Sequence, residues 1–516
     1  MNLIKDLECA KQGVKEIIQN PALTHEQQMM RLSLFAENIL DYPKNTPDEF
    51  YSLFDEGIIC DLSEGHAPYC PRYILPDYDK FLKEGSKFLR LDPAKTLYEA
   101  ITNLLIIYRH VPSITHFPVY LGHIDRLLDP FIEDEQEAKA MIKGFLITMD
   151  RTLNSSFCHA NLGPKPTRAG RIILELEQEL QDAVPNLTLC YDEEKTGDEF
   201  ALLAMETTLK CANPAFACHQ KYVDDFGFEN YGMVSCYNGL PVGGGAFTLS
   251  RLRLSQIAAK AKSFDEFFEQ TLPNAIDVLC RFMECKIDFL VNETPFFETN
   301  FLVKENLIHK EKFVGLFGMV GLAECVNNLM EKQGKTGRFG HCEEADQLGV
   351  KVLDELERLV NSFESKYGEV WNNHFMLHAQ VGAEGDAGEN NMGVSSPGAR
   401  IPIGEEPDLY THLKNAGLYH KYFTSGIGDH FPFDTTSCRN PEAVLDIFKG
   451  AYKVGMRYIS AYASDGDLIR VTGYLVKKSD VAKFGEGEQI INETVGGSYD
   501  NIIRKRIYDR KVQSAT

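Results

Sequence analysis

Two residues far apart in the chain, Cys236 and Gly473, have types and neighbours suited to radical chemistry. Gly473 lies in the pentapeptide RVTGY, from Arg470 to Tyr474. A glycyl α-carbon can hold an unpaired electron because it has no side chain to clash when the carbon flattens, and the flanking amides delocalise the spin. Cys236 lies in YGMVSCYNGLPVGGGAF, between a short β-prone run and a glycine-rich turn. A thiol in such a position could exchange a hydrogen atom with the radical.

Each of these residues also has an ordinary structural interpretation. A glycine after the β-branched pair Val471-Thr472 is typical of a tight turn that needs positive φ. A single cysteine is typical of a small buried hydrophobic residue, as most free cysteines are. The presence of both residues in one chain favours the radical interpretation. Gly473 alone would leave the choice open, and Cys236 alone would favour the structural one.

Three further segments precede the cysteine loop and cover the chain from about residue 115. They are LGHIDRLLDPFIEDE (121–135), VPNLTLCYDEEKTGDEF (184–200) and NPAFACHQ (213–220). With these segments, in this order, the chain resembles the glycyl radical enzymes, which include pyruvate formate-lyase and anaerobic ribonucleotide reductase. It is most similar to their compact YjjI-like branch, whose reaction is unassigned. His123 stands where the first segment usually has arginine.

The resemblance implies a fold, a reaction cycle and a partner. The fold is α/β, a ten-stranded barrel of two parallel half-sheets with surrounding helices. A radical activating enzyme uses S-adenosylmethionine to remove a hydrogen atom from Gly473, and the stored radical then takes the hydrogen atom of the Cys236 thiol. The resulting thiyl abstracts hydrogen from a small organic substrate under anaerobic conditions. The glycyl radical is then a protein-derived cofactor, and no bound cofactor is expected.

The residues around the cysteine depart from the subgroups of known reaction. Pyruvate formate-lyase has paired cysteines where this chain has Ser235 before Cys236, which disfavours acyl transfer. Dehydratases, choline lyase and arylacetate decarboxylases have Cys-x-Glu, whereas Asn238 in the glutamate position cannot titrate. Anaerobic ribonucleotide reductase has four zinc-binding cysteines before its glycine loop, a region where this chain has only Cys438.

The substrate therefore stays unassigned, and two alternatives stay open. One is a ribonucleotide reductase-like activity without the zinc site, which segments 318–330 and 426–436 favour. The other is a non-catalytic glycyl radical repair protein, which would need only the C-terminal domain. The Cys236 loop argues against the repair protein.

Four polar residues are candidates for the substrate pocket, because the resemblance brings their segments together. A histidine in such a pocket could move protons near neutral pH, although each of the four is more often a satisfied structural residue. The cluster 341–344 is not predicted to bind metal, because adjacent residues at a helix start cannot all face one ion. The candidate pocket residues are His159, Asn213, His219 and Asn238.

Composition disfavours several partners. The formal net charge of −22 would repel nucleic acid or an anionic membrane surface. No run reaches the length of a membrane span, and MNLIKDLECAKQGVKE lacks the apolar region of a secretory signal. Thirteen scattered cysteines without a C-x-x-C pair predict reduced thiols in a cytoplasmic protein. The sequence is compatible with a homodimer.

Hydrophobic periodicity divides the chain into three predicted domains. Residues 1–115 carry helical signals such as HEQQMMRLSLFAENIL and predict an outer helical layer. Residues 116–425 alternate helical and β-prone segments, which predicts the α/β barrel that carries the cysteine loop. Residues 426–516 are predicted to form the glycyl radical domain.

Two further elements are predicted within the barrel domain. The apolar residues Leu348, Val352, Leu356, Leu359 and Phe363 share one face and predict an amphipathic helix. Residues 383–408 are rich in Gly, Pro and Asn and predict a long loop. That loop is either a plain connector or a segment that folds over the mouth of the active site, and we favour the second interpretation.

Overall fold

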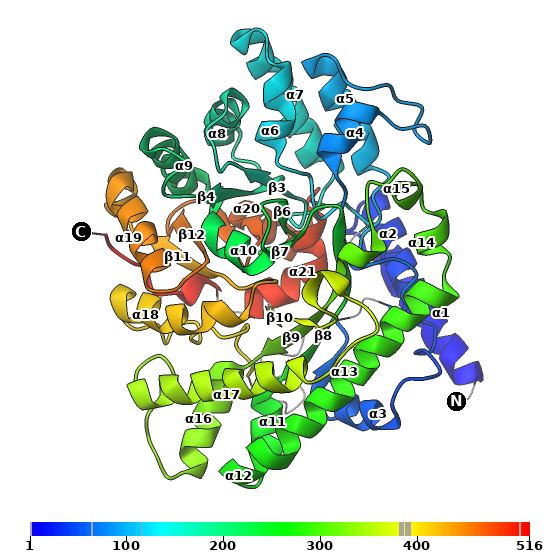
Figure 1. Ribbon diagram of the computed structural model, residues 1–516, viewed down its shortest axis with the longest axis vertical. Helices are drawn as coiled ribbons and strands as arrows, with labels where there is room; N and C mark the ends of the chain where they lie inside the picture. The colour runs from blue at the N-terminus through cyan, green and yellow to red at the C-terminus, as the bar shows by residue number, and fades with distance from the viewer. Residues whose placement is uncertain are drawn as a thin grey trace.

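Two five-stranded sheets lie at the centre of the molecule, and helices surround them (Figure 1). The computed structural model describes residues 3–62, 65–114, 116–380, 386, 394–504 and 507–515. Every strand of both sheets is almost wholly buried, so both faces of each sheet lie in the interior of the protein. This arrangement confirms the predicted α/β fold with two half-sheets and an outer shell of helices.

The first sheet has three parallel strands at its core, in the order β8, β9, β10. Two short strands from the N-terminal region pair with β8 in the antiparallel sense, so this half-sheet is not parallel throughout. The strands are β1 (Ile59–Cys60), β2 (Tyr73–Leu75), β8 (Gly244–Arg253), β9 (Phe313–Val320) and β10 (Met376–Ala379).

The second sheet has the order β11-β12-β5-β4-β3. Strands β3, β4 and β5 are parallel to one another, and β11 is parallel to β12, while β12 and β5 are antiparallel. Two strands from the last ninety residues thus complete a sheet that begins far upstream. The strands are β3 (His159–Leu162), β4 (Asn186–Tyr191), β5 (Ala215–Cys218), β11 (Asp429–Phe433) and β12 (Tyr458–Ala463).

Amphipathic helices cover the outer faces of both sheets. The predicted stripe of α17 is buried at Leu348, Val352 and Leu356, although the helix ends at Asn361, before Phe363. Beside the first sheet lie α11 (Leu254–Lys260), α13 (Leu272–Asp288), α16 (Leu322–Lys332) and α17 (Glu343–Asn361). Beside the second lie α7 (Glu135–Thr152), α8 (Arg168–Leu180), α9 (Asp198–Cys211), α18 (Leu409–Tyr419) and α19 (Pro441–Lys453).

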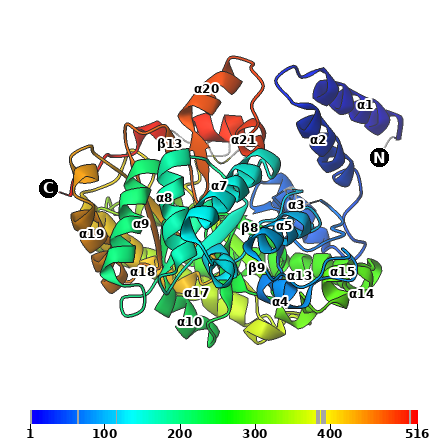
Figure 2. The same ribbon diagram turned by 90° about the horizontal axis from the view of Figure 1, so that it is seen from above.

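The N-terminal segment forms a pair of helices at the edge of the molecule, α1 (Leu3–Gln19) and α2 (His25–Glu37). Figure 2 shows this pair beside the C-terminal helices α20 (Lys478–Gly485) and α21 (Glu493–Arg504). Gln27 Nε2 donates to the carbonyl oxygen of Ile490 at 3.0 Å, and Thr24 and Gln27 form a capping box at the start of α2. The N-terminal helix pair therefore contacts the segment that leads into α21.

Further helices link these layers. They are α3 (Asp48–Asp55), α4 (Tyr78–Glu84), α5 (Leu97–Tyr108), α6 (Ile124–Leu128), α10 (His219–Phe226), α12 (Phe264–Glu266), α14 (Phe296–Thr299) and α15 (Phe301–Lys304). Within the described residues, no helix has the length and apolar composition needed to cross a membrane.

Candidate active site

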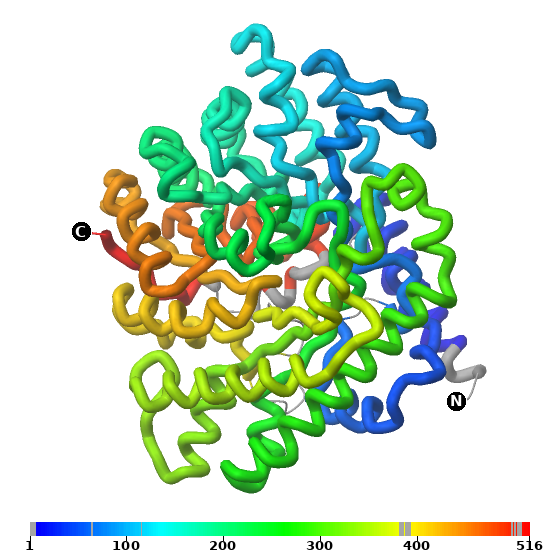
Figure 3. The backbone as a smooth tube through the Cα atoms, in the orientation of Figure 1, coloured from blue at the N-terminus to red at the C-terminus, as the bar shows by residue number. Residues whose placement is uncertain are grey.

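Two hairpins supply the loops that meet at the candidate site. Strands β6 (Tyr231–Val234) and β7 (Asn238–Pro241) pair in the antiparallel sense, and Cys236 lies in the three-residue turn between them. Strands β13 (Leu468–Arg470) and β14 (Leu475–Lys477) form the second hairpin, whose loop contains Gly473. In the view of Figure 3 the C-terminal segment, in red, overlaps the middle of the molecule, and Figure 2 shows its helices α20 and α21 at one edge.

Gly473 lies against the backbone of Cys236. An ideal Cβ built on Gly473 would be 2.4 Å from Cys236 Cβ and 2.6 Å from its Cα and carbonyl carbon. Real Cβ atoms do not approach backbone atoms that closely, so no larger residue fits here. The φ angle of Gly473 lies outside the left-handed region. The interpretation of this glycine as a positive-φ turn is therefore wrong, and close approach is what requires glycine.

The Cys236 thiol is buried, with 5% of the residue exposed. Burial raises its pKa to about 11, although nearby hydroxyl groups of Thr472 and Ser235 oppose part of that rise. The sulfur therefore keeps its proton throughout the neutral range. A protonated thiol carries the hydrogen atom that a radical can take, and it is a poor nucleophile.

Asn186, at the start of β4, joins the two loops. Its Nδ2 donates to the carbonyl oxygen of Gly473 at 2.7 Å and to that of Ser235, the residue before Cys236, at 3.2 Å. Its Oδ1 accepts from Arg470 Nη1 at 3.1 Å, which fixes the orientation of the amide. One buried amide therefore fixes the position of the cysteine loop relative to the glycine loop.

Arg470 is fully buried beneath the glycine loop. Besides Asn186, its guanidinium donates to the carbonyl oxygens of Ala212 at 2.8 Å and Gly473 at 3.2 Å, and to Asn213 Oδ1 at 3.3 Å. Among the described residues no carboxylate pairs with it, and burial lowers its pKa. Backbone carbonyl oxygens and side-chain amide oxygens thus stabilise the positive charge of this arginine.

Asn213 makes hydrogen bonds through both ends of its amide. Nδ2 donates to Glu177 Oε2 and to the carbonyl oxygen of Pro185, both at 3.0 Å, and Oδ1 also accepts from the N–H of Leu187 at 2.8 Å. Asn213 therefore contacts Arg470, which in turn bonds the glycine loop, and Asn213 makes no hydrogen bond to the Cys236 loop in the described structure.

His159 supports the cysteine loop from β3. Nδ1 lies 3.0 Å from the carbonyl oxygen of Ser235, so it must carry the proton, and Nε2 then accepts from Thr188 Oγ1 at 2.7 Å. Burial lowers the pKa of His159 to about 3, so the ring is neutral. The Thr188 hydroxyl lies 3.2 Å from Tyr458 Oη, which donates to the carbonyl oxygen of Cys236 at 3.2 Å.

His219 and Asn238 lie at opposite ends of the cysteine hairpin. His219 Nδ1 is 3.0 Å from Tyr231 Oη at the base, and burial lowers its pKa. Asn238, next to the tip, donates from Nδ2 to the carbonyl oxygen of Val234 at 2.9 Å, while its Oδ1 is buried without a partner. The structure thus brings His159 and Asn238 to the Cys236 loop and leaves His219 at the hairpin base.

Sequence reasoning missed several residues at the site. Asn186 lies in the PNLT segment and Arg470 in RVTGY itself, so the resemblance offered a signal for both. Arg510 donates to the carbonyl oxygens of Arg470, at 2.7 Å, and of Val471, and so ties the C-terminal tail to the glycine loop. No sequence pattern marked Arg510 or Arg400, which lies over the ring of Tyr237.

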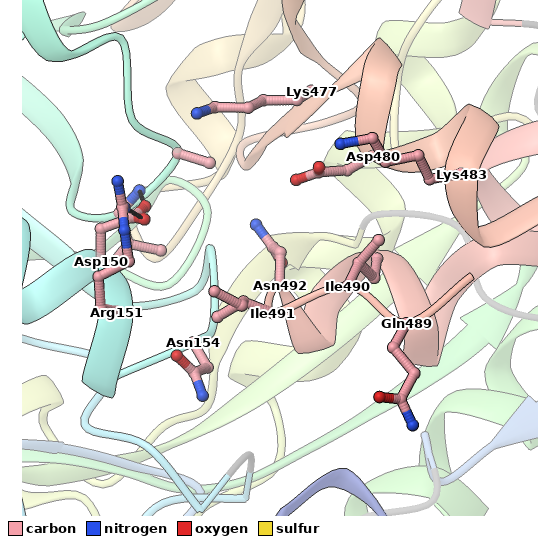
Figure 4. A pocket seen from close by; sticks show the side chains of 12 residues that line it. Asp150, Arg151, Asn154, Lys477, Asp480, Lys483, Gln489, Ile490, Ile491 and Asn492 are labelled. Atoms are coloured by element: carbon pink, nitrogen blue, oxygen red, sulfur yellow. Dashed lines mark hydrogen bonds and ion pairs between the residues drawn. The ribbon is translucent and has the colours of Figure 1, made fainter. Parts of the chain in front are cut away.

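A cavity of about 360 Å³ lies beside Lys477, the last residue of β14 (Figure 4). Asp150, Arg151 and Asn154 from the end of α7 line one side, and Lys477 and other residues of the C-terminal region line the other. Neither Cys236 nor Gly473 lines it. Asp182 pairs with both Arg151 and Lys477 at 3.3 Å, so ion pairs hold the hairpin to the body here.

Residues 383–385 and 387–393 of the predicted loop at 383–408 lie outside the described part of the chain. The described residue Asp386 is buried and accepts hydrogen bonds from Arg251 at 2.7 Å and Arg253 at 3.0 Å, both on β8. All thirteen cysteines are free thiols. No three His, Cys, Asp or Glu side chains gather as metal ligands within the described ranges.

Comparison with solved structures shows the same fold. An anaerobic ribonucleotide reductase matches 93% of this chain and 85% of its own with a TM-score of 0.67 at 14% identity. The glycerol-bound glycerol dehydratase of Clostridium butyricum matches 91% and 82% with a TM-score of 0.66 at 12% identity. Both proteins are glycyl radical enzyme barrels, and at these identities they show the fold alone.

Sequence comparison shows the family. An uncharacterised protein of Haemophilus influenzae is 43% identical over 97% of this chain and 98% of its own length. The uncharacterised protein YjjI of Escherichia coli is 44% identical over 92% and 90%. The family model described as glycyl radical enzyme YjjI-like matches residues 23–513. The chain therefore belongs to the YjjI-like family of glycyl radical enzymes.

Proposed function

We propose that Gly473 stores the radical and that Cys236 becomes the thiyl that acts on a small organic substrate. The observation that carries this proposal is the contact between the two loops, in which a Cβ on Gly473 would be 2.4 Å from Cys236 Cβ. Hydrogen-atom transfer needs such proximity, because the reacting atoms must approach within about 3–3.5 Å. Both residues are buried, which keeps water from the radical.

The cycle balances in hydrogen atoms. A radical S-adenosylmethionine activase removes one α-hydrogen of Gly473. The glycyl radical then takes the hydrogen atom of the Cys236 thiol, and the thiyl takes one from a substrate C–H bond. When the product radical recovers a hydrogen atom from Cys236, the thiyl recovers one from Gly473. The raised thiol pKa of about 11 keeps the S–H bond present for this exchange.

Three surrounding residues act by positioning in this proposal. Asn186 and Arg470 hold the carbonyl oxygen of Gly473, and His159 holds that of Ser235. A neutral His159 with both nitrogens engaged inside the protein keeps its tautomer and moves no proton. Asn213 acts one step further out, through Arg470.

The residues beside the thiol narrow the reaction class. Ser235 offers no second sulfur for an acyl intermediate, and the amide of Asn238 cannot accept a proton in an elimination. We therefore propose a reaction other than acyl transfer by paired thiols or base-assisted elimination at position 238. The two solved structures, a ribonucleotide reductase and a glycerol dehydratase, match this chain with nearly equal TM-scores of 0.67 and 0.66. Their similarity therefore favours neither substrate.

Oxygen tests the radical position without knowledge of the substrate. Dioxygen adds to a carbon-centred glycyl radical, and the peroxyl product breaks the backbone at that residue. Air exposure of the anaerobically activated protein should release a C-terminal fragment that begins at Gly473, detected by mass spectrometry. Protein that was never activated should remain intact in the same air. Cleavage elsewhere, or equal cleavage without activation, would exclude Gly473 as the radical residue.

Asn186→Ala should weaken the coupling between the loops while the glycyl radical still forms. In D₂O the Cys236 thiol carries deuterium, so radical exchange replaces the α-hydrogen of Gly473 and collapses the doublet in the electron paramagnetic resonance spectrum. Loss of the Asn186 amide leaves two buried carbonyl oxygens with one donor fewer. We expect the collapse to slow by about 10- to 100-fold, the effect of a small misplacement of reacting groups.

The matched control is Asn103→Ala, which removes a buried amide that donates to a carbonyl oxygen far from the site, that of Asp92 at 3.0 Å. This variant should lose some thermal stability and keep the wild-type rate of collapse. If Asn186→Ala collapses as fast as the wild type, the amide does not position the two loops.

A further inference from the structure

Arg400 places a guanidinium beside the cysteine loop. Its Cζ lies 5.5 Å from the centre of the Tyr237 ring, and Tyr237 directly follows Cys236. Nε donates to the carbonyl oxygen of Gly428 at 2.7 Å, which fixes the plane of the guanidinium. Tyr237 is fixed in turn, because its hydroxyl donates to the carbonyl oxygen of Ala379 at 3.0 Å.

The hydrogen-bond partners of Arg400 carry no negative charge. Nη2 donates to His430 Nε2 at 2.9 Å, while His430 Nδ1 bonds the hydroxyl of Ser460. Burial, and then the Arg400 charge, hold the pKa of His430 well below its usual value, so this partner is neutral. None of the described residues places a carboxylate in contact with Arg400, and its side chain is only partly buried.

Asp429, which directly precedes His430 in the chain, makes its own hydrogen bonds elsewhere. His420 Nε2 lies 2.9 Å from Asp429 Oδ2, and His412 Nε2 lies 3.5 Å from Oδ1. Burial by itself would raise the pKa of Asp429, but these two imidazoles, and then the charge of Arg400, hold it well below the usual range. Asp429 is thus a buried carboxylate with its own hydrogen-bond partners, and within the described part of the chain no carboxylate is hydrogen-bonded to the guanidinium of Arg400.

From this geometry we infer that Arg400 binds a carboxylate group of the substrate and so presents an adjacent carbon to Cys236. The inference rests on the proposed role of Cys236 and names the class of molecule that the thiyl meets. With Nε and one Nη2 hydrogen engaged, the guanidinium keeps N–H groups on both terminal nitrogens, which match the two oxygens of a carboxylate. One arginine suits a single negative charge better than a phosphate dianion.

Other groups around Tyr237 fit a small polar acid. His378 lies 6.1 Å from the Tyr237 ring, and burial lowers the pKa of His378 to about 3, so the ring adds no charge. The unpaired Oδ1 of Asn238 and the ring of His378 both face Gly426, where a Cβ would lie 3.0 Å from the oxygen and 2.4 Å from His378 Cε1. Asn238 Oδ1 could accept a hydrogen bond from a hydroxyl of the same substrate.

Alkylation of the unactivated protein tests the inference. Iodoacetate and iodoacetamide have nearly the same shape and differ in charge, and each transfers its CH₂ carbon to a thiolate sulfur as iodide leaves. The ratio of carboxymethylated to carbamidomethylated Cys236, read by peptide mass spectrometry in competition, should exceed the ratio at the exposed Cys9 by about tenfold or more. One charge-assisted hydrogen bond supplies discrimination of that size.

Arg400→Gln should bring the Cys236 ratio down to that of Cys9, and Arg400→Lys should give an intermediate value. The matched control is Arg358→Gln, which removes an exposed arginine whose partner is Glu355 on the same helix. That control should leave the Cys236 ratio unchanged. A wild-type ratio at Cys236 equal to that at Cys9 would overturn the inference.

If neither reagent reaches Cys236, thermal unfolding with small acids and their amides tests whether Arg400 binds a carboxylate. At constant ionic strength, lactate, pyruvate or glycolate should raise the unfolding midpoint of the wild type more than the matching amides do, and Arg400→Gln should lose the difference. Protection by inorganic phosphate alone would assign Arg400 to a phosphate group and overturn the carboxylate. No protection by any acid would overturn the inference as well. Both experiments use protein without a radical, so their failure is separate from any failure of the Gly473 assignment.

Discussion

Gly473→Ala should abolish the glycyl doublet after anaerobic activation and lower the stability of the folded protein. The added Cβ would lie 2.4–2.6 Å from Cβ, Cα and the carbonyl carbon of Cys236, two of them backbone atoms that cannot rotate away. One loop must therefore move, at a cost typical of overpacking, about 1–3 kcal/mol. The displaced loops would no longer allow hydrogen-atom transfer. Electron paramagnetic resonance measures the first effect and thermal unfolding the second.

Gly450→Ala is the matched control, because it makes the same substitution in the same region of the chain. Gly450 is exposed on α19, and no atom lies within 4 Å of the position its Cβ would take. Alanine in a helix is more favourable than glycine by about 1 kcal/mol, so this variant should be slightly more stable. It should also keep the full doublet. A doublet that survives in Gly473→Ala would show that the radical resides elsewhere.

The sequence predicted the local elements well because their signals are local. The apolar stripe Leu348, Val352 and Leu356 has the spacing of a helix face, and α17 buries those residues. The pairing of strands has no such signal. Strands β5 and β12 are neighbours in the sheet although more than 200 residues separate them, and no periodicity in either strand names the other. The two half-sheets were predicted from the resemblance to a family, not from the pattern of residues.

The residues of the candidate site likewise include some that the sequence predicts and some that only the folded structure reveals. Cys236 and Gly473 could be singled out because their chemistry is specific to their residue types. Asn186 could not, since an asparagine in a strand is unremarkable until its amide is found between the carbonyl oxygens of Ser235 and Gly473, the second of them 287 positions away. Arg400 was also missed, because its significance comes from lacking a carboxylate partner among the described residues, which is a property of the folded protein.

The pocket candidates show what residue type alone cannot decide. His159 has the side chain most often used for proton transfer, yet burial lowers its pKa to about 3 and both nitrogens bond within the protein. Asn238, whose amide does not titrate, has the unpaired oxygen next to the cysteine loop. In the proposed mechanism the histidine therefore positions the loop, and the asparagine is the residue free to meet a substrate.

Cys236→Ala should separate storage of the radical from its use. Activation acts on Gly473, so this variant should still give the glycyl doublet, while all turnover is lost. In D₂O the wild-type doublet should collapse, because the deuterated thiol gives deuterium to the glycyl carbon and the thiyl can then take back the α-hydrogen. Without a thiol beside Gly473 the doublet should persist. Cys236→Ser should behave like the alanine variant, since an O–H bond is too strong for the glycyl radical to break.

The control for this variant is Cys325→Ala, which removes another fully buried thiol, on α16, where alanine suits the helix. Its doublet should collapse in D₂O as fast as that of the wild type. The comparison is strict because both cysteines are buried and unpaired, and only Cys236 lies against the glycyl carbon. Collapse in Cys236→Ala at the wild-type rate would mean that hydrogen reaches Gly473 by another route, and the thiyl would then have to be sought at another residue.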